Sequence, residues 1–582
     1  MQDINGGMVL RRAGFALAVL LTSIGSLWLL VLALRPLSVV DIIMLVAFAC
    51  TLPWTVIGFW NALLGVLVMR LARDPEGYAV PLLRRPLGNG PLRTSTALLY
   101  CIRNEDTGLI RRNLAAMLDD LAATGHGAAF HAYILSDTDD AATGSAEEEM
   151  ASSLAAAYAG RIAVTYRRRT ENSAFKAGNI RDFCDRWGAQ HDFMLVLDAD
   201  SFMGAEAIVR IVRYMEAEER LGILQTLVVG MPSTSPFARI FQFGMRLGMR
   251  SYTLGSTLWQ GNCGPYWGHN AIIRIRPFTE HCHLPALRDG TPILSHDQVE
   301  GALMRRAGYE VRVLPQEGGS WEENPPTLLE FIRRDLRWCR GNMQYWELLG
   351  LPNLRPVSRY QFVFAILMFA NAPAWIVMIL LAAFATPLGL LQFDPLWTAV
   401  VASAMLVMSY APKVASLVDT LVRPELRAAF GGAPRMLGAF ALETAFNILL
   451  QPVMALSETV CLIQLAAGRA ASWPAQLRSD HAVPVTEAVR WLWLHTVLGA
   501  FGLWWFSRFV PDLMGLATLL VGPLLLSVPF AVVSSWPALG RAFARWGVGR
   551  LPEEAETPAA LAALDLPAVA EAQRAGIRAA AA

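Results

Sequence analysis

The feature that most constrains this chain is the placement of its apolar side chains, which form long runs on either side of a polar block at 70–355. The runs 13–34 and 42–69 are each long enough to cross a bilayer, which needs roughly 20 helical residues. Only 17% of the 582 residues are charged, against about 25% in soluble domains, so much of the chain must lie in lipid. The sequence therefore predicts a membrane protein with a soluble domain inserted between its spans.

Apolar runs resume after the polar block, at 361–391, 397–418, 436–467, 489–507 and 512–536. Arginines flank 469–490 and return at 541–550, so both segments are expected on the cytoplasmic side. The run 436–467 must then enter and leave on that side, and we interpret it as a hairpin of two short helices bent near Pro452. This gives about eight spans, whereas a single helix at 436–467 would give seven and place the C-terminus outside.

These boundaries divide the chain into five parts. They are two N-terminal spans at 1–69, a basic linker at 70–95, a soluble domain at 96–355, a C-terminal membrane region of about six helices at 356–540, and a cytoplasmic tail at 541–582.

The soluble domain has an alternating pattern of strands and helices. Short β-branched and apolar runs predict strands at 96–100, 132–135, 162–166 and 193–197. Helical patterns lie between them, at 109–121 and 146–159. This rhythm is typical of α/β domains with a mostly parallel sheet.

Two aspartates, Asp198 and Asp200, follow the apolar run at 193–197. Open α/β sheets bind ligands at the carboxyl ends of their strands, and this run reads as a buried strand. Carboxylate oxygens suit Mg²⁺ or Mn²⁺, and such an ion can hold a diphosphate. The alternative is ordinary turn or capping chemistry, which the neighbouring basic loop makes less convincing.

That basic loop contains Arg169 and leads into Lys176 and Asn179. Only two of the 49 cationic residues are lysines, so a lysine at 176 is a marked departure from the arginine used elsewhere. A compact ammonium with three donors suits phosphate oxygens at the start of a helix. A solvated run of charge is the alternative.

Three further polar clusters follow predicted strands or precede the membrane. Asp137 ends a strand but also fits a turn, and Asp297 either acts in chemistry or caps a helix. Arg334, Arg337 and Trp338 stand just before the first downstream span, where they fit phosphate and sugar binding or a positive-inside flank.

Taken in order, these clusters resemble the processive membrane synthases of glycosyltransferase family 2, which carry the pattern D, DxD, TED and QxxRW. Asp137 matches the first motif and Asp198 and Asp200 the second. Asp297 matches the last residue of the third, here Ser-His-Asp, and Arg334-Asp-Leu-Arg-Trp338 matches the fourth with Arg in place of Gln.

With both of these departures, the sequence resembles a narrower group, the glucosyltransferase H family of osmoregulated periplasmic glucan synthesis. The likeness covers roughly residues 10–540 and rests on the stretches 175–180, 264–274, 294–298 and 337–342. It implies a GT-A-type, Rossmann-like α/β glycosyltransferase domain inserted in an all-α membrane domain. It also implies inverting transfer of glucose from UDP-glucose to a β-1,2-linked glucan.

The resemblance also assigns roles to residues. It makes Asp297 the general base and gives Mg²⁺ or Mn²⁺ to Asp198 and Asp200. The donor nucleotide would be bound by Asp137, Arg169, Lys176, Asn179, Asp198, Arg334 and Arg337. The acceptor would lie against Trp338, His269 and Asn270.

The expected location is the bacterial inner membrane, with the catalytic domain and both termini cytoplasmic. Membrane lipid and the growing glucan are expected partners, and the resemblance adds a periplasmic glucan-processing protein similar to glucans biosynthesis protein G and acyl carrier protein. The membrane half would export the glucan, because a polar polymer cannot cross hydrocarbon unaided. By analogy of position, 470–487 would be a cytoplasmic gating loop.

Three other functions are considered. A net charge of +1 argues against a nucleic-acid binder. A synthase of another polysaccharide, of the cellulose, curdlan or hyaluronan kind, would share the motifs. A transporter with a nucleotide-sensing domain is less consistent, because the chain has no Gly-x4-Gly-Lys-Ser/Thr loop for ATP.

Overall fold

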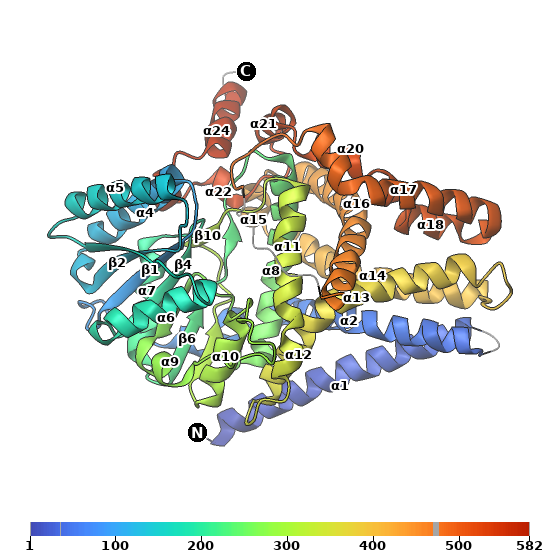
Figure 1. Ribbon diagram of the computed structural model, residues 1–582, viewed down its shortest axis with the longest axis horizontal. Coiled ribbons are helices and arrows are strands. Elements are labelled where there is room, and N and C mark those ends of the chain that lie inside the picture. The colour runs from blue at the N-terminus through green and yellow to red at the C-terminus, as the bar shows by residue number, and fades with distance from the viewer. Residues whose placement is uncertain (1, 35–36, 469–476, 581–582) are drawn as a thin grey trace.

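The computed structural model describes residues 2–34, 37–468 and 477–580. An α/β domain lies at one end of the molecule, and long helices extend from it toward the other end (Figure 1). The domain contains a seven-stranded sheet in the order β3-β2-β1-β4-β8-β6-β9. Its strands are β1 (Thr96–Ile102), β2 (Phe130–Ser136), β3 (Ala163–Arg168), β4 (Phe193–Asp198), β6 (Leu221–Gln225), β8 (Ala271–Arg274) and β9 (Glu310–Val313).

The first four strands pair in parallel, and β8 runs antiparallel to both of its neighbours, β4 and β6. The four strands predicted from the sequence are confirmed. Parallel strands end at the same edge of a sheet, so the polar residues after β2 and β4 meet there.

A second, three-stranded sheet in the order β5-β10-β7 contributes further side chains. It consists of β5 (Phe202–Met203), β7 (Val229–Gly230) and β10 (Ser320–Glu322). Since β5 follows directly after Asp200, the pairing of β10 with β5 brings Glu322 close to the Asp-x-Asp turn.

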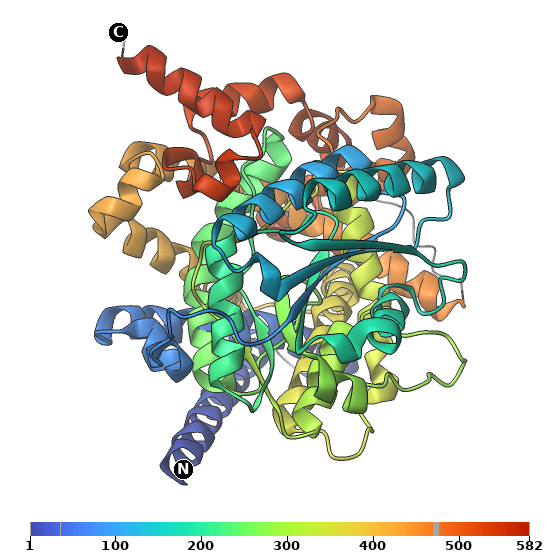
Figure 2. The same ribbon diagram turned by 90° about the vertical axis from the view of Figure 1, so that its left-hand side faces the viewer.

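Helices cover both faces of the large sheet (Figure 2). On one face, α4 (Thr107–Ala123), α5 (Ala141–Ala157) and α7 (Ala205–Ala217) bury residues such as Leu114, Leu154 and Ile208. On the other, α6 (Phe175–Trp187), α9 (Ile275–His281) and α10 (Asp297–Arg306) bury Phe183, Phe278 and Leu303. The predicted helices at 109–121 and 146–159 correspond to α4 and α5.

Five described helices are long and apolar enough to cross a membrane. They are α1 (Gln2–Ala33), α2 (Val39–Leu71), α13 (Pro356–Phe384), α14 (Pro395–Val422) and α16 (Ala433–Ala466). Between them and the sheet lie α8 (Pro236–Gln260) and α11 (Leu328–Met343), which pack on α2 and α16 respectively. Shorter helices complete this part: α3 (Pro75–Ala79), α12 (Tyr345–Leu348) and α15 (Pro424–Ala429).

The hairpin predicted at 436–467 is wrong, because α16 is one 34-residue helix with Pro452 inside it. Figure 1 shows α16 lying across the direction shared by α2, α13 and α17 (Val485–Phe509). The predicted span at 512–536 is broken into short pieces, with α18 (Met514–Leu520), α19 (Gly522–Leu525) and α20 (Ser527–Ser534). The total of eight spans stays a prediction.

The segment after 536 is not a free tail, because it packs against α8 and the core of the α/β domain. It forms α21 (Pro537–Trp546), α22 (Pro552–Ala555), α23 (Ala559–Ala562) and α24 (Pro567–Ala580). Glu554 makes a 3.0 Å ion pair with Arg239 of α8, and both side chains are 1% exposed. Leu561 and Leu564 join the apolar core beneath the sheet. The alanine-rich composition of this segment gave no sign of these contacts.

Candidate active site

The Asp-x-Asp sequence forms a tight turn at the end of β4. The amide of Ser201 donates to the carbonyl of Asp198 at 3.0 Å, and the amide of Asp198 donates to Ser201 Oγ at 3.0 Å. The Tyr100 hydroxyl of β1 holds the same turn through the Ser201 carbonyl, at 2.8 Å. The turn therefore fixes the positions from which both aspartates reach the sheet edge.

Lys176 connects the turn to the next part of the site. It lies in the first turn of α6, where its ammonium pairs with Asp198 and donates to the carbonyl of Gly268 at 2.7 Å. A guanidinium is larger and planar, so an arginine could not make the same compact pair of contacts. The unusual lysine of the sequence thus lies at the centre of the site.

Asp297 lies on the other side of Gly268. It is the first residue of α10, and a Cβ at Gly268 would lie 3.2 Å from the Asp297 Cβ. Gly268 also has a φ of +85°, a conformation that favours glycine. The glycine therefore leaves room for Asp297, and Lys176, which contacts Asp198 and the Gly268 carbonyl, is near enough to affect the pKa of Asp297.

The two aspartates have opposite pKa shifts. Burial raises the pKa of Asp297, and His296 and the amide of Gln298 only partly offset this. Burial would also raise the pKa of Asp198, but the positive charges of Lys176 and Arg478 help to hold it at about 2. Asp198 therefore remains ionised, and Asp297 is the more basic carboxylate.

Asp200 pairs with Arg478, a residue that sequence reasoning did not assign to the site. Arg478 also lies 3.3 Å from Glu105, which follows β1. It belongs to the predicted gating loop at 470–487, of which residues 470–476 lie outside the described part. Their predicted role as a loop over the site is therefore not tested.

Further carboxylates surround the turn, and the sequence analysis missed them. Glu322 and Glu323 end β10 and follow it, and Glu105 follows β1 at the same edge. Burial and the charge of Asp200 raise the pKa of Glu323 to about 7, although Arg112 lies 3.1 Å away. Glu105 could have been found by the rule applied to Asp137, since both follow parallel strands.

Helix α11 brings Arg334, Arg337 and Trp338 close to the carboxylates around the Asp-x-Asp turn. Arg334 stacks on Trp338, with the guanidinium carbon 4.8 Å from the ring centroid. Burial lowers the pKa of Arg334, while Glu322, Asp335 and Asp200 favour its charged form. Arg337 lies near Arg478 and Glu105. Trp338 is 46% exposed, so its ring is available to a ligand.

His269 lies between Glu322 and the Asp-x-Asp turn. Its Nε2 lies 3.5 Å from Glu322, and its Nδ1 lies 3.5 Å from Ser201 Oγ. The next residue differs. Asn270 is fully buried, and its amide donates to Ser320 Oγ at 2.9 Å and to the Trp321 carbonyl at 3.2 Å. Asn270, which directly precedes β8, is thus tied to β10, and its contact with an acceptor stays a prediction.

Three residues predicted to bind the donor nucleotide, Asp137, Arg169 and Asn179, also contact other parts of the domain. Arg169 makes a bidentate pair with Asp137, at 2.7 and 2.6 Å, and both side chains are 6% exposed. Asn179 is 1% exposed, accepts from Arg167 at 2.7 Å and donates to the Leu135 carbonyl at 3.0 Å. These side chains hold the loop before α6 against β2, and their contact with a nucleotide stays a prediction.

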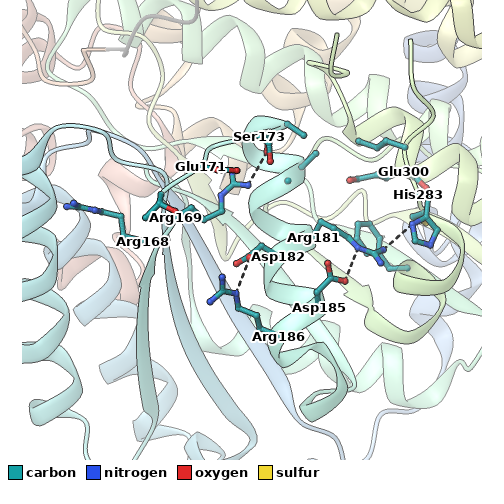
Figure 3. A pocket seen from close by; sticks show the side chains of 17 residues that line it. Arg168, Arg169, Glu171, Ser173, Arg181, Asp182, Asp185, Arg186, His283 and Glu300 are labelled. Atoms are coloured by element: carbon teal, nitrogen blue, oxygen red, sulfur yellow. Dashed lines mark hydrogen bonds and ion pairs between the residues drawn. The ribbon is translucent and has the colours of Figure 1, made fainter. Parts of the chain in front are cut away.

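A hollow of about 770 Å³ lies beside α6, but its lining does not include Asp198, Asp200 or Asp297. Figure 3 shows some of its charged side chains paired, as Arg181 is with Asp185 at 3.0 Å and with His283 at 3.3 Å. The lining has four arginines and four acidic residues, so it has no excess positive charge to favour a nucleotide diphosphate.

The turn offers two carboxylates, those of Asp198 and Asp200, that could help to hold a hard divalent cation. Within the described residues, no three His, Cys, Asp or Glu side chains form a ready metal site. Mg²⁺, however, is often held by one or two carboxylates together with substrate phosphates. Asp198 and Asp200 supply two such carboxylates, and Glu105 and Glu323 lie near them, with pKa values raised by burial and also by the charge of Asp200.

Comparisons with known proteins agree with this geometry. The family model for glycosyl transferase family 2 matches residues 101–282, and that for glycosyl transferase family group 2 matches 193–411. Glucans biosynthesis glucosyltransferase H of Rhodopseudomonas palustris (strain TIE-1) is 35% identical over 95% of this chain and 78% of its own length.

The chain belongs to the glucans biosynthesis glucosyltransferase H family.

A second member of the glucosyltransferase H family, from Pectobacterium carotovorum, is 36% identical over 90% of this chain, which spans 63% of that relative. Among solved structures, a mannosyltransferase from Pyrobaculum calidifontis in complex with GDP-Man and Mn²⁺ covers 66% of this chain and 100% of its own. It is 16% identical with a TM-score of 0.42, a distant likeness in shape. The protein is thus a membrane-associated glucosyltransferase with a GT-A-type catalytic domain.

Proposed function

We propose that this protein transfers glucose from UDP-glucose to a growing β-1,2-linked glucan with inversion at the anomeric carbon. One observation supports this most strongly: an ionised Asp198 of the Asp-x-Asp turn and a more basic aspartate, Asp297, lie on either side of Lys176 and Gly268. Inverting transfer needs these two functions, a stabilised leaving group and a proton acceptor, on opposite sides of one sugar.

On the donor side, Lys176 and the arginines of α11 would hold the diphosphate. Lys176 is a compact charge in the first turn of a helix, where backbone amides also favour anions. Arg334 and Arg337 approach the Asp-x-Asp turn from another direction. Their charges would stabilise the negative charge that develops on UDP as the glycosidic bond breaks.

On the acceptor side, Asp297 would take the proton from the attacking hydroxyl. As that oxygen bonds to the anomeric carbon, the bond to UDP breaks and UDP leaves with the electron pair. The raised pKa of Asp297 favours this role because a base with a higher pKa accepts a proton more readily. The exposed face of Trp338 would stack on the acceptor sugar.

A divalent cation, Mg²⁺ or Mn²⁺, would be held by Asp200 and Asp198, and it would add positive charge against the leaving diphosphate. In the structure, Arg478 forms an ion pair with Asp200. Donor binding would therefore require Arg478 to exchange its partner, and the diphosphate itself is a suitable new one.

The membrane half would carry the product across the bacterial inner membrane, with the catalytic domain on the cytoplasmic side. Basic segments next to the helices support this orientation. A periplasmic glucan-processing protein and acyl carrier protein are proposed as partners on the family resemblance alone.

The experiment is to incubate membranes containing the protein with labelled UDP-glucose and to determine the linkage of the polymer. We expect a β-1,2-linked glucan from the wild type and none from Asp297→Asn. Polymer made from another nucleotide sugar but not from UDP-glucose would contradict the proposed donor. A 1,3- or 1,4-linked product would contradict the proposed linkage.

A further inference from the structure

Three arginines from different parts of the chain meet at one buried carboxylate, that of Asp419, whose side chain is 3% exposed. Arg70 at the end of α2 lies 3.0 Å from it, and Arg423 at the end of α14 lies 3.2 Å away. Arg250 of α8 is 4.0 Å from the same carboxylate. Each arginine is between 33% and 43% exposed, so part of each guanidinium faces outward.

The charges at this cluster do not balance. Among the described residues, Asp419 is the one acidic partner in an ion pair with Arg70, Arg250 or Arg423, which leaves two positive charges over. One turn earlier on α8, Arg246 pairs with two acids, Glu317 at 3.1 Å and Glu553 at 2.9 Å. The same helix thus neutralises one arginine fully and leaves the next one in a cationic group.

The helices that carry the cluster are packed closely, so the arginines are held in place. A Cβ at Gly65 of α2 would lie 1.8 Å from the backbone oxygen of Ser251, which shows how tightly α2 meets α8. Ser251 in turn shares a 2.8 Å hydrogen bond with Ser416 of α14. A pre-organised group of guanidiniums binds an anion with less loss of side-chain freedom than separate surface arginines.

Exposed apolar side chains stand next to the cluster. Leu71 follows Arg70 and is 80% exposed, and Val422 precedes Arg423 and is 54% exposed. Val418 beside Asp419 is 49% exposed. These residues lie where α2 and α14 end toward the catalytic domain (Figure 1). A surface that is cationic at its edge and apolar beside it has the chemistry of a lipid at the membrane interface.

We propose that Arg70, Arg250 and Arg423 bind the phosphate group of an anionic phospholipid, with its acyl chains against Leu71 and Val422. Guanidiniums bind phosphate oxygens with paired hydrogen bonds, and basic pockets between membrane helices suit anionic headgroups. The surplus of positive charge at Asp419 favours a lipid with net negative charge over a zwitterionic one. The site would fix α2, α8 and α14 to one another below the catalytic domain.

The test uses the full chain in nanodiscs of phosphatidylcholine, with or without phosphatidylglycerol. Thermal unfolding and the lipid that stays bound in native mass spectrometry are measured. We expect phosphatidylglycerol to raise the Tm and to remain bound. Arg250→Gln and Arg423→Gln should each weaken its retention about fivefold, the effect of one cationic side chain near a membrane surface.

Two controls decide the matter. Arg541→Gln removes an exposed arginine of α21, outside the cluster, and should leave retention unchanged. Inorganic phosphate should not raise the Tm in phosphatidylcholine nanodiscs. If Arg541→Gln and Arg423→Gln lost equal amounts of bound phosphatidylglycerol, the proposal would be overturned. The lipid would then be attracted by basic charge anywhere on the protein and not by the cluster. A phosphate effect equal to that of the lipid would overturn the lipid as the ligand.

Discussion

The donor carboxylates and the acceptor carboxylate lie in one site, but their surroundings differ in a way that separates their roles. Asp198 has the cations Lys176 and Arg478 near it and a pKa of about 2, whereas Asp297 has a pKa raised by burial. Lys176 stands between them and also touches the Gly268 carbonyl. Two aspartates pushed in opposite directions are a common sign of divided chemical roles, one for charge stabilisation and one for proton transfer.

The largest effect is expected on the donor side, from Asp200→Asn. Losing this carboxylate removes the anchor for a cation at the diphosphate, and we expect transfer to fall by about 10³-fold, with UDP binding weakened as well. Asp185→Asn, an exposed change on α6, serves as the control. Normal transfer by Asp200→Asn would mean that Asp200 does not stabilise the leaving diphosphate.

A smaller loss, of about 10²-fold, is expected for Lys176→Met, because one preformed cationic donor is lost. Since Lys176 contacts both halves of the site, its loss should lower the rate of transfer and raise the concentration of UDP-glucose needed. The matched control is Arg186→Met, on the solvent side of α6. If only the rate changed, Lys176 would not contribute to donor binding.

The pH profile should separate the two sides further. Asp297 must be ionised to accept a proton, and its raised pKa means that transfer falls with decreasing pH before an ordinary aspartate, near pH 4, would protonate. Binding of UDP should stay level over the same range because Asp198 is ionised down to about pH 2.

The control for this profile is Glu323→Gln, which removes a neighbouring carboxyl whose pKa is raised to about 7. The acidic limb should persist in that variant. Its disappearance would assign the limb to Glu323 and not to Asp297.

The smallest effect is expected for Arg478→Gln. Arg478 competes with a divalent cation for Asp200, so its removal should lower the metal concentration needed for half-maximal transfer by several-fold. Titration with Mg²⁺ and Mn²⁺ measures this directly. A higher metal requirement would mean that Arg478 supports the site in another way.

The sequence predicted the strands and the aspartates that follow them because both depend on local patterns. Buried strands are apolar runs, and parallel strands place their ends at one edge, so Asp198 could be placed at a site from local patterns. Asp297, which begins α10, was assigned to the same site only by the family resemblance. The sequence could not reveal that Asp137 would pair with Arg169, or that the amide of Asn270 would donate to Ser320 and to the Trp321 carbonyl. Such pairings depend on which residues the fold brings together from a distance.

The membrane half was harder to predict for a related reason. Apolar composition alone does not show whether a run such as 436–467 forms one helix or two, and α16 is one continuous helix with Pro452 inside it. Arg478 and the clustered arginines at Asp419 come from segments that read as a loop and as ordinary basic flanks. Their meaning depends on the carboxylates they meet, which only the structure provides.

The most direct test of the divided site is to measure UDP binding and glucose transfer together in Asp297→Asn, with the exposed Asp289→Asn as control. We predict that UDP binds to Asp297→Asn as it does to the wild type, while transfer falls by about 10²–10⁴-fold. Full transfer by this variant, or the loss of UDP binding with transfer, would contradict the account.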